Sequence, residues 1–192
     1  DTVGRRINDI RILDTQSGEF LPDLIGNAST ALAWSADGQY LFYLNKDTET
    51  LLAYQLMRHR LGTDSAVDVL VYEETDNTFY TSLWRSRSMD YLFLAHENTD
   101  TTEVQWLAAD NPTGEFKPFL PRETGHEYDI DHADGRFFIR TNWKANNFRV
   151  MSSTLENSAD KSGWIEIISN RDDAMVRNLQ AFDHWLVIGE RK

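Results

Sequence analysis

Four short runs of aromatic and aliphatic residues decide the fold: YLFYL at residues 40–44, YLFLA at 91–95, RFFIR at 136–140 and WLVIG at 185–189. The runs begin at 40, 91, 136 and 185, so the intervals between them are 51, 45 and 49 residues. A repeat at a nearly fixed interval is typical of an architecture built from copies of one supersecondary unit. Aromatic and β-branched residues bounded by Gly, Asp and Asn indicate that each run is a β-strand.

Further strands are predicted around each core run. A strand and a turn precede the core at residues 31–39 (ALAWSADGQ), 82–90 (SLWRSRSMD) and 129–135 (DIDHADG), a third strand follows at 53–61, 102–108 and 147–151, and a fourth at 67–73, 115–120 and 164–168. Two turns carry Asp-Gly, at Asp37-Gly38 and Asp134-Gly135, which supplies the positive φ that a tight hairpin requires. The strands of each unit are therefore expected to pair antiparallel in chain order.

Each unit of four short strands has the size of a β-propeller blade. The repeat of 45 to 51 residues is longer than that of helical repeat proteins. The sequence predicts an all-β fold with almost no helix, since no segment keeps apolar residues at a spacing of 3.6 for more than about two turns. Three complete four-stranded antiparallel blades are expected at residues 30–73, 78–120 and 126–168, flanked by partial blades at 5–22 and 176–191. Residues 1–192 are thus predicted to be one domain, an incomplete β-propeller that belongs to a larger ring.

The charge of the chain favours some partners and excludes others. Asp and Glu number 31 against 19 Lys and Arg, a formal net charge of -12, which repels nucleic acid. Solubility alone is the commoner reason for such acidity, and attraction of cationic peptides is the alternative. The sequence contains no Cys, which favours the cytoplasm, with the periplasm as the alternative. No apolar run is long enough to span a bilayer and residues 1–10 do not resemble a signal peptide, so no membrane association is expected.

The usual catalytic motifs are missing from the sequence. A nucleophile elbow needs two glycines four residues apart, and no two of the ten glycines have that separation. The same glycine positions exclude the dinucleotide-binding fingerprint, and no Gly-Lys pair exists for a phosphate-binding loop. We therefore expect no catalytic, cofactor-binding or metal-binding residue in this chain.

The densest group of polar residues is a candidate metal site of low specificity. Its members are His126, Glu127, Asp129, Asp131, His132 and Asp134. Strand alternation would place both histidines on one face and Glu127, Asp129 and Asp131 on the other, so the ligands would diverge. The favoured interpretation is an acidic inner strand near the propeller channel, with its histidines satisfied by hydrogen bonds.

Other candidate features are interpreted as structural. His59, His96 and His184 are isolated, and alternation divides Arg58, His59 and Arg60 between two faces, so they form no basic patch. The sequon Asn27-Ala28-Ser29 would matter only in a secreted protein. A set of aromatic residues recurs at equivalent positions of the units and is expected to pack between sheets; it comprises Trp34, Phe42, Tyr43, Tyr80, Trp84, Phe93, Phe137 and Phe138.

Four longer runs carry a family resemblance. They are TLLAYQLMRHRLGT at residues 50–63, LVYEETDNTFYTSL at 70–83, FLPRETGHEYDIDH at 119–132 and RFFIRTNWKANNF at 136–148. These runs resemble the propeller of the oligopeptidase B (protease II) type in the prolyl oligopeptidase family. The resemblance covers nearly the whole chain and is more specific than the WSADG turn at 34–38, which many propellers share.

The resemblance implies a two-domain serine peptidase that cleaves short peptides after Lys or Arg. Its catalytic Ser, Asp and His belong to an α/β-hydrolase domain, and a seven-bladed propeller covers the active site and limits access to it. This chain would be the middle of that propeller, with the hydrolase domain as its partner and no peptidase activity of its own. Because cutting a ring exposes apolar faces, the isolated chain is expected to self-associate.

Two other functions remain open at this point. A free-standing TolB-like or WD-like propeller would bind protein partners on its rim, and the incomplete end blades argue against it. A metal-dependent propeller enzyme such as a lactonase would use the carboxylates around Asp129 and Asp131. Metal analysis of the purified chain separates the second alternative from the peptidase interpretation.

Overall fold

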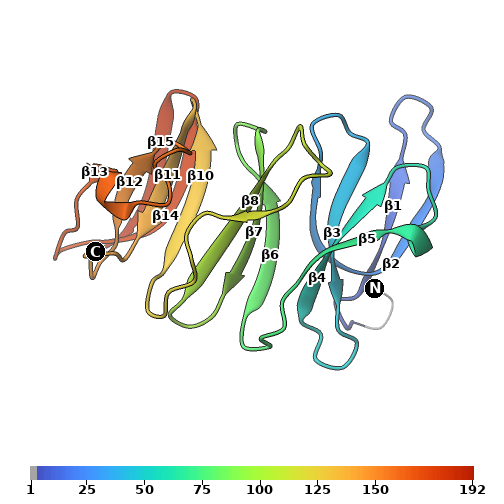
Figure 1. Ribbon diagram of the computed structural model, residues 1–192, viewed down its shortest axis with the longest axis horizontal. Helices are drawn as coiled ribbons and strands as arrows, with labels where there is room; N and C mark the ends of the chain where they lie inside the picture. The colour runs from blue at the N-terminus through green and yellow to red at the C-terminus, as the bar shows by residue number, and fades with distance from the viewer. Residues whose placement is uncertain (1–3) are drawn as a thin grey trace.

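A computed structural model describes residues 4–192 as four antiparallel sheets arranged in a curved row (Figure 1). The first sheet contains β1 (Asn8–Leu13), β2 (Phe20–Trp34), β3 (Tyr40–Lys46), β4 (Ala53–Arg60) and β5 (Val69–Glu73). The second contains β6 (Tyr80–Arg85), β7 (Tyr91–Glu97), β8 (Thr102–Ala108) and β9 (Lys117–Pro118). The third contains β10 (Tyr128–Ala133), β11 (Arg136–Thr141), β12 (Arg149–Ser153) and β13 (Ile165–Ile168), and the C-terminal hairpin contains β14 (Met175–Phe182) and β15 (Trp185–Arg191).

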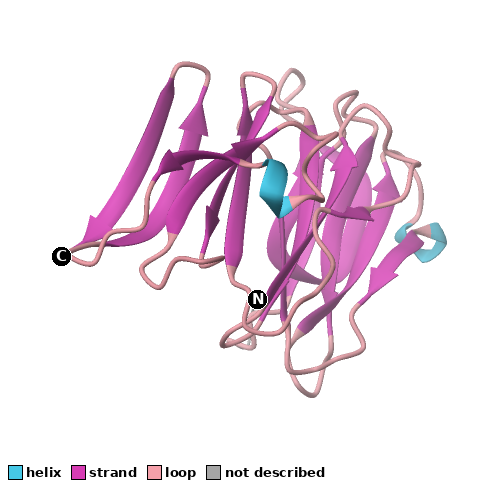
Figure 2. Ribbon diagram, turned by 60° about the vertical axis from the view of Figure 1, so that its left-hand side comes forward, coloured by secondary structure: helices cyan, strands magenta, loops and turns pink. Residues whose placement is uncertain are grey.

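Helix is almost absent, as Figure 2 shows. Between residues 4 and 192 there are two turns of 3-10 helix, η1 (Ser65–Val67) and η2 (Lys161–Gly163). In each, the carboxylate of the preceding residue, Asp64 or Asp160, accepts a hydrogen bond from a backbone N–H of the turn. None of the helices in this part of the chain is long and apolar enough to cross a membrane. The all-β prediction is confirmed.

The first sheet differs from the predicted blade at its N-terminal edge. The fifteen-residue strand β2 pairs with β1 through its first half and with β3 through its second, and Ala28 faces both Asn8 and Asn45. The stretch 5–22, predicted as a partial blade of its own, therefore continues into the same sheet as 30–73. A register shift between Ala28 and Leu32 marks the change of partner. At the other end, β14 and β15 form a separate two-stranded sheet.

The two Asp-Gly turns differ from each other. Asp134 and Gly135 both have positive φ, 49° and 69°, as expected of a two-residue hairpin turn. At the other turn only Gly38 has positive φ, 67°, so the prediction is wrong for Asp37. The carboxylate of Asp37 instead accepts hydrogen bonds from Ser35 Oγ at 2.5 Å and Gln39 N at 2.9 Å, which stabilise a longer turn.

The sheets pack face to face through three different cores. Between the first and second sheets the buried side chains are mainly aliphatic, among them Leu44, Leu56, Leu83 and Leu94. Between the second and third sheets they are mainly aromatic, including Phe93, Phe119, Tyr128, Phe137 and Trp164. Phe148, Val150 and Val176 bury the contact between the third sheet and the C-terminal hairpin. Each fully buried large side chain contributes about 1.5–3 kcal/mol to this packing.

The two ends of the row lie apart in Figure 1. The C-terminal hairpin exposes apolar side chains on its outer face. Leu186 and Ile188 of β15 pack on the third sheet, whereas Trp185 and Val187 alternate outward and are 76% and 52% exposed. Such an unpartnered face is the surface on which a further sheet would pack in a propeller.

Candidate functional site

The polar group on β10 is divided between two faces as alternation predicts. His126 and His132 are buried, Asp129 is exposed, and Asp131 is half-buried. Among residues 4–192 there is no group of three or more His, Cys, Asp or Glu that could hold a metal ion. The arrangement offers no support to a lactonase-like metal centre at Asp129 and Asp131.

The two buried histidines of this group are hydrogen-bonded, as expected. His126 Nε2 lies 2.9 Å from Thr141 Oγ1, and its Nδ1 lies 3.3 Å from Lys161 Nζ. His132 Nδ1 lies 2.7 Å from Ser88 Oγ on the second sheet. Burial, together with the nearby Lys161 ammonium, lowers the pKa of His126 to about 4. His126 is therefore neutral at pH 7 and serves packing.

Asp131 joins three parts of the fold. Its Oδ1 accepts hydrogen bonds from the backbone N–H groups of Arg87 at 3.1 Å and His132 at 2.9 Å, and its Oδ2 accepts one from Ala181 N at 3.1 Å. These donors come from the β6–β7 turn, from β10 and from β14. Asp131 is thus a connection between sheets, while Asp129 forms an ion pair with Arg140 at 2.8 Å and is 55% exposed at its side chain.

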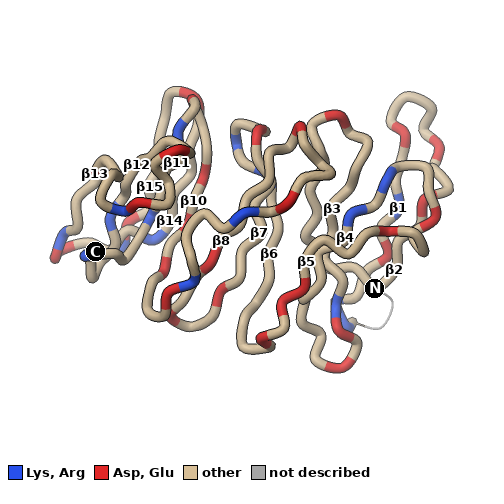
Figure 3. Tube along the Cα trace, viewed as in Figure 1, with Lys and Arg blue, Asp and Glu red and all other residues tan. Residues whose placement is uncertain are grey.

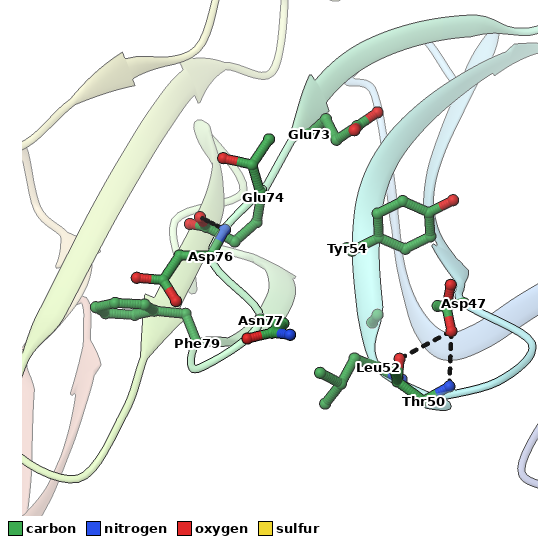
Figure 4. A pocket seen from close by; sticks show the side chains of 11 residues that line it. Asp47, Thr50, Leu52, Tyr54, Glu73, Glu74, Asp76, Asn77 and Phe79 are labelled. Atoms are coloured by element: carbon green, nitrogen blue, oxygen red, sulfur yellow. Dashed lines mark hydrogen bonds between the residues drawn. The ribbon is translucent and has the colours of Figure 1, made fainter.

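A cavity lies between the first and second sheets, where the β3–β4 turn faces the β5–β6 connection (Figure 4). It has a volume of about 310 Å3. Its lining is acidic and aromatic, with Asp47, Thr50, Leu52, Ala53, Tyr54, Glu73, Glu74, Thr75, Asp76, Asn77 and Phe79. Figure 3 shows acidic residues along both segments that border it. We call this cavity the acidic cavity.

Several carboxylates of the acidic cavity also hold its walls in shape. Asp47 Oδ1 accepts hydrogen bonds from Thr50 N at 2.6 Å and Thr50 Oγ1 at 2.9 Å, and Asp76 Oδ1 accepts from Thr78 N at 3.0 Å. These bonds lower the pKa values of Asp47 and Asp76, so both side chains are ionised at neutral pH. Glu73 Oε2 accepts a hydrogen bond from Gln55 Nε2 at 2.8 Å. The cavity therefore presents fixed negative charge.

Next to the cavity, and sharing Glu74 with it, lies a largely buried group that we call the Arg122 cluster: Glu74, His96, Glu103 and Arg122. Arg122 Nη2 lies 2.5 Å from Glu74 Oε2, and its Nε lies 2.9 Å from Glu103 Oε2. The guanidinium also lies over the ring of Phe79, 4.0 Å from its centroid. Because Glu74 follows β5 and Glu103 is on β8, this cluster fastens the first sheet to the second. Burial alone would raise the pKa of Glu74, but the hydrogen bonds from Arg122 and from the backbone of Asp76, together with nearby positive charge, outweigh burial and the pKa is lowered.

The remaining histidines differ in surroundings that the sequence did not reveal. His184 is exposed, whereas His59 and His96 are completely buried. His59 lies between Asp23 and Asp68, at 2.8 Å from each. No local motif pairs these residues, because the two carboxylates come from β2 and from the segment after η1. Arg58 and His59 do point to opposite sides, since Arg58 Nη1 donates to Pro112 O at 2.8 Å.

The sequon and the aromatic set are also placed by the structure. Asn27 Nδ2 donates to Lys46 O at 2.8 Å, so the side chain of the sequon is engaged within the first sheet. Phe42, Tyr43, Phe93 and Phe137 are buried, which confirms the expected packing role. Trp34, Trp84 and Phe138 are half-buried, and Tyr80 is 66% exposed, so the prediction is wrong for Tyr80.

Comparison with known proteins assigns this fold to a family. The family model described as "Prolyl oligopeptidase, N-terminal beta-propeller domain" matches residues 1–192. The chain belongs to this family of peptidase propellers. This confirms the resemblance drawn from the runs at 50–63, 70–83, 119–132 and 136–148, and it favours a propeller within a longer peptidase over a free-standing binding module.

Individual relatives place the chain near the oligopeptidase B type of this family. It is 40% identical to dipeptidyl aminopeptidase BI of Pseudoxanthomonas mexicana over 192 residues, and 30% identical to protease 2 of Moraxella lacunata over 185 residues. These matches cover 100% and 95% of this chain but 26% of each relative, so the chain spans about a quarter of their length. The structure of oligopeptidase B from Leishmania major has the same fold, with a TM-score of 0.91 at 24% identity over 100% of this chain and 27% of that one.

Proposed function

We propose that this chain is the propeller portion of a serine peptidase that cleaves short peptides after Lys or Arg, and that it limits access to a separate catalytic domain. The observation that carries the proposal is the family match over residues 1–192 in a chain a quarter as long as its relatives. The role is one of selection, because this chain offers no nucleophile elbow and the chemistry would come from the rest of the protein.

Selection by size follows from the packing of the sheets. A propeller admits a substrate through its channel or past its edge, and neighbouring sheets here are joined by buried cores and by connections such as Asp131 and Arg122. A folded protein cannot pass a ring whose sheets do not separate, whereas an extended peptide can. The proposed result is preference for short peptides.

Selection by charge follows from the net charge of -12 and from the acidic cavity. Fixed carboxylates on the side walls of a cavity concentrate cationic substrates near them and raise the rate of association. Lys and Arg side chains and a free amino terminus are the cationic groups of a peptide. The proposed specificity for basic peptides is consistent with this field.

The direct test uses the complete protein and this chain side by side. The complete protein should hydrolyse short peptides after Arg and Lys and lose activity to a serine-directed inhibitor, while the 192-residue chain alone should be inactive at any concentration. Inhibitor-sensitive turnover by the purified chain would overturn the assignment. Cleavage by the complete protein after residues other than Lys or Arg would overturn the proposed specificity.

The electrostatic part has its own test. In the complete protein, kcat/KM for basic peptides should fall as ionic strength rises, and Glu73→Gln with Asp76→Asn should flatten that slope. Glu156→Gln with Asp172→Asn, at two exposed positions outside the cavity, is the matched loss of two charges and should change the slope less. Equal slopes in the cavity variant and the native protein would show that the attracting field arises elsewhere. Asp131 is unsuitable for this test because its carboxylate connects three parts of the fold.

A second candidate activity is the release of dipeptides from the amino end of peptides. It is favoured by the 40% identity to dipeptidyl aminopeptidase BI. A negative field would serve it equally, because the substrate then carries a free α-ammonium group. Peptides with a free and with an acetylated amino terminus separate the two candidates: endopeptidase cleavage after Arg tolerates acetylation, and dipeptide release does not.

The end faces of the row would contact the remainder of the protein. Trp185 and Val187 on the C-terminal hairpin are exposed, and covering several hundred Å2 of such surface yields several kcal/mol at about 25 cal/mol per Å2. We therefore expect the isolated chain to self-associate. Light scattering at about 100 μM should report a mass above that of the monomer, and a monomeric mass would contradict the expectation.

A further inference from the structure

A buried imidazole held between two carboxylates connects separate segments of the first sheet. His59 on β4 is 0% exposed; its Nε2 lies 2.8 Å from Asp23 Oδ1 on β2, and its Nδ1 lies 2.8 Å from Asp68 Oδ1 beyond η1. Both carboxylate side chains are 1% exposed. We call Asp23, His59 and Asp68 the His59 cluster. It is separate from the acidic cavity and from the Arg122 cluster.

The two short distances fix the number of protons in the His59 cluster. A neutral imidazole has one N–H, so it can donate to only one of two ionised carboxylates. The second contact would then place a bare ring nitrogen against a carboxylate oxygen, which is repulsive. Two hydrogen bonds therefore require two protons, either both on His59 or one on His59 and one on a carboxyl group.

Other donors decide where the second proton resides. Asp23 Oδ1 also accepts a hydrogen bond from Gly62 N at 2.6 Å, and Asp68 Oδ2 accepts one from Tyr43 Oη at 2.9 Å. Each of these bonds stabilises the ionised carboxylate over the acid, because a carboxylate is the stronger acceptor. The proton is thereby favoured on the ring.

We propose that His59 is a doubly protonated imidazolium at neutral pH and that the His59 cluster is a pH-sensitive link, which holds the β1–β2 hairpin and the η1 segment on the first sheet. The link is strongest while the ring carries both protons. Loss of one proton turns one attractive contact into a repulsive one and releases Asp23 or Asp68.

Within residues 4–192, Asp23 and Asp68 are the charged groups that act on His59. Tyr43 from β3 is a neutral donor because its pKa is raised well above the usual value. Burial by itself lowers the pKa of His59, but the hydrogen bonds to Asp23 and Asp68 and the negative charges of both carboxylates together outweigh burial and raise it. The hydrogen-bond geometry and the direction of the pKa shift therefore both favour the second proton on the His59 ring.

The pH window follows from this direction. A histidine whose pKa is raised on folding stabilises the protein fully below its unfolded-state value of 6.5, and the stabilisation is lost as pH rises through the folded-state value. On the acid side, the pKa of Asp23 is lowered, so its contribution persists until pH falls below the usual value of 3.8. The link is thus expected to hold in mildly acidic and neutral solution and to weaken toward alkaline pH.

The direct experiment observes the ring nitrogens. In the 15N-labelled chain at pH 7, long-range 1H–15N correlation spectra should show two protonated nitrogens for His59. His96 and His126 are internal controls, because burial lowers the pKa of each to about 4 and each should show one protonated and one bare nitrogen. A bare nitrogen in the His59 ring at pH 7 would overturn the proposal and place the second proton on a carboxyl group.

A second measurement tests the link itself. Hydrogen exchange of the β1–β2 amides, corrected for the intrinsic pH dependence, should speed up by tenfold or more as pH rises above neutrality in the native chain. In His59→Gln these amides should already exchange fast at pH 6 and show no further pH response, while His184→Gln, an exposed matched control, should behave as the native chain. If His59→Gln retains native protection and the native pH response, the cluster does not hold the hairpin.

Discussion

His59 and His96 are equally buried, yet their surroundings shift their pKa values in opposite directions. Both rings are 0% exposed and both lie close to carboxylates. Around His59, the ring is the cation that pairs with the two carboxylates among residues 4–192, and its pKa is raised. Around His96, Arg122 already forms ion pairs with Glu74 and Glu103, so burial dominates and the pKa falls to about 4.

The opposite pKa shifts of His59 and His96 show that burial alone does not set the charge of a core histidine. What decides is whether the neighbouring carboxylates already have a cation. It also separates two structural tasks: the His59 cluster links segments within the first sheet, and the Arg122 cluster fastens the first sheet to the second.

Arg122→Met should remove the difference between the two histidines at the greatest cost in stability. It leaves Glu74 and Glu103, 6% and 13% exposed, without a cation, which should lower the free energy of unfolding by about 3 to 4 kcal/mol. His96 should then gain a second ring proton at neutral pH, as proposed for His59. The measurements are denaturant unfolding and the 15N spectrum of the His96 ring.

Arg60→Met on the exposed end of β4 is the matched control for this change and should cost under about 0.5 kcal/mol. A His96 ring that keeps a bare nitrogen in Arg122→Met would show that Arg122 does not set its charge.

Stability should pass through a maximum near pH 6.5, because the histidines respond to pH in opposite senses. His96 and His126 have pKa values of about 4 in the folded protein, so below pH 6.5 these side chains bind protons in the unfolded chain but not in the folded one. Stability therefore falls as pH decreases toward 4. For His126 the loss of stability is at most about 3 kcal/mol, because a difference of one in pKa corresponds to about 1.36 kcal/mol. His59, with a raised pKa, makes stability fall above 6.5.

Two variants show which histidine causes the fall in stability on each side of the maximum. His126→Gln should reduce the fall below pH 6.5 (the acid limb), and His59→Gln should abolish the fall above pH 6.5 (the alkaline limb). The free energy of unfolding is measured by urea unfolding at fixed ionic strength. A profile that rises steadily from pH 6 to 9 would contradict the comparison.

Tyr43→Phe should weaken the His59 cluster without touching the ring. It removes the 2.9 Å hydrogen bond to Asp68, a bond to a charged group, and should cost about 1.5 kcal/mol. Loss of that donor also makes Asp68 a better base, so the alkaline limb should move. The same substitution at Tyr54, which lines the acidic cavity, is the control and should leave the pH profile unchanged.

An exposed ion pair gives the smallest expected effect. Arg171 and Asp173 lie 3.2 Å apart with side chains 42% and 72% exposed, so Asp173→Asn should change stability by less than about 0.5 kcal/mol. A larger loss of stability would show that this exposed ion pair contributes more than is usual for pairs screened by solvent.

The repeat was predictable from sequence because each strand carries its own local signal. The predicted third strand at 102–108 coincides with β8 (Thr102–Ala108), and the core runs begin β3, β7, β11 and β15. Alternation also predicted correctly that the histidines and carboxylates of β10 diverge. These features depend on side chains two residues apart, which a sequence displays directly.

Pairings over long sequence distances were not predictable. Asp23 and Asp68 lie 36 and 9 residues from His59, and Arg122 lies 48 from Glu74, so no local pattern announces either cluster. The joining of β1 to the first sheet depends on Ala28 pairing on both sides of one strand, which the turn signals did not mark. A sequence shows which segments are strands more readily than which edges meet.

Substrate length tests the proposed function most directly. The complete protein should be given one Arg-containing cleavage sequence in two forms, as a short free peptide and within an exposed loop of a stably folded protein. If the propeller limits access, kcat/KM for the peptide should exceed that for the folded substrate by several orders of magnitude, and unfolding and fragmenting the second substrate should restore cleavage. Comparable cleavage of the peptide and the folded protein would contradict the account.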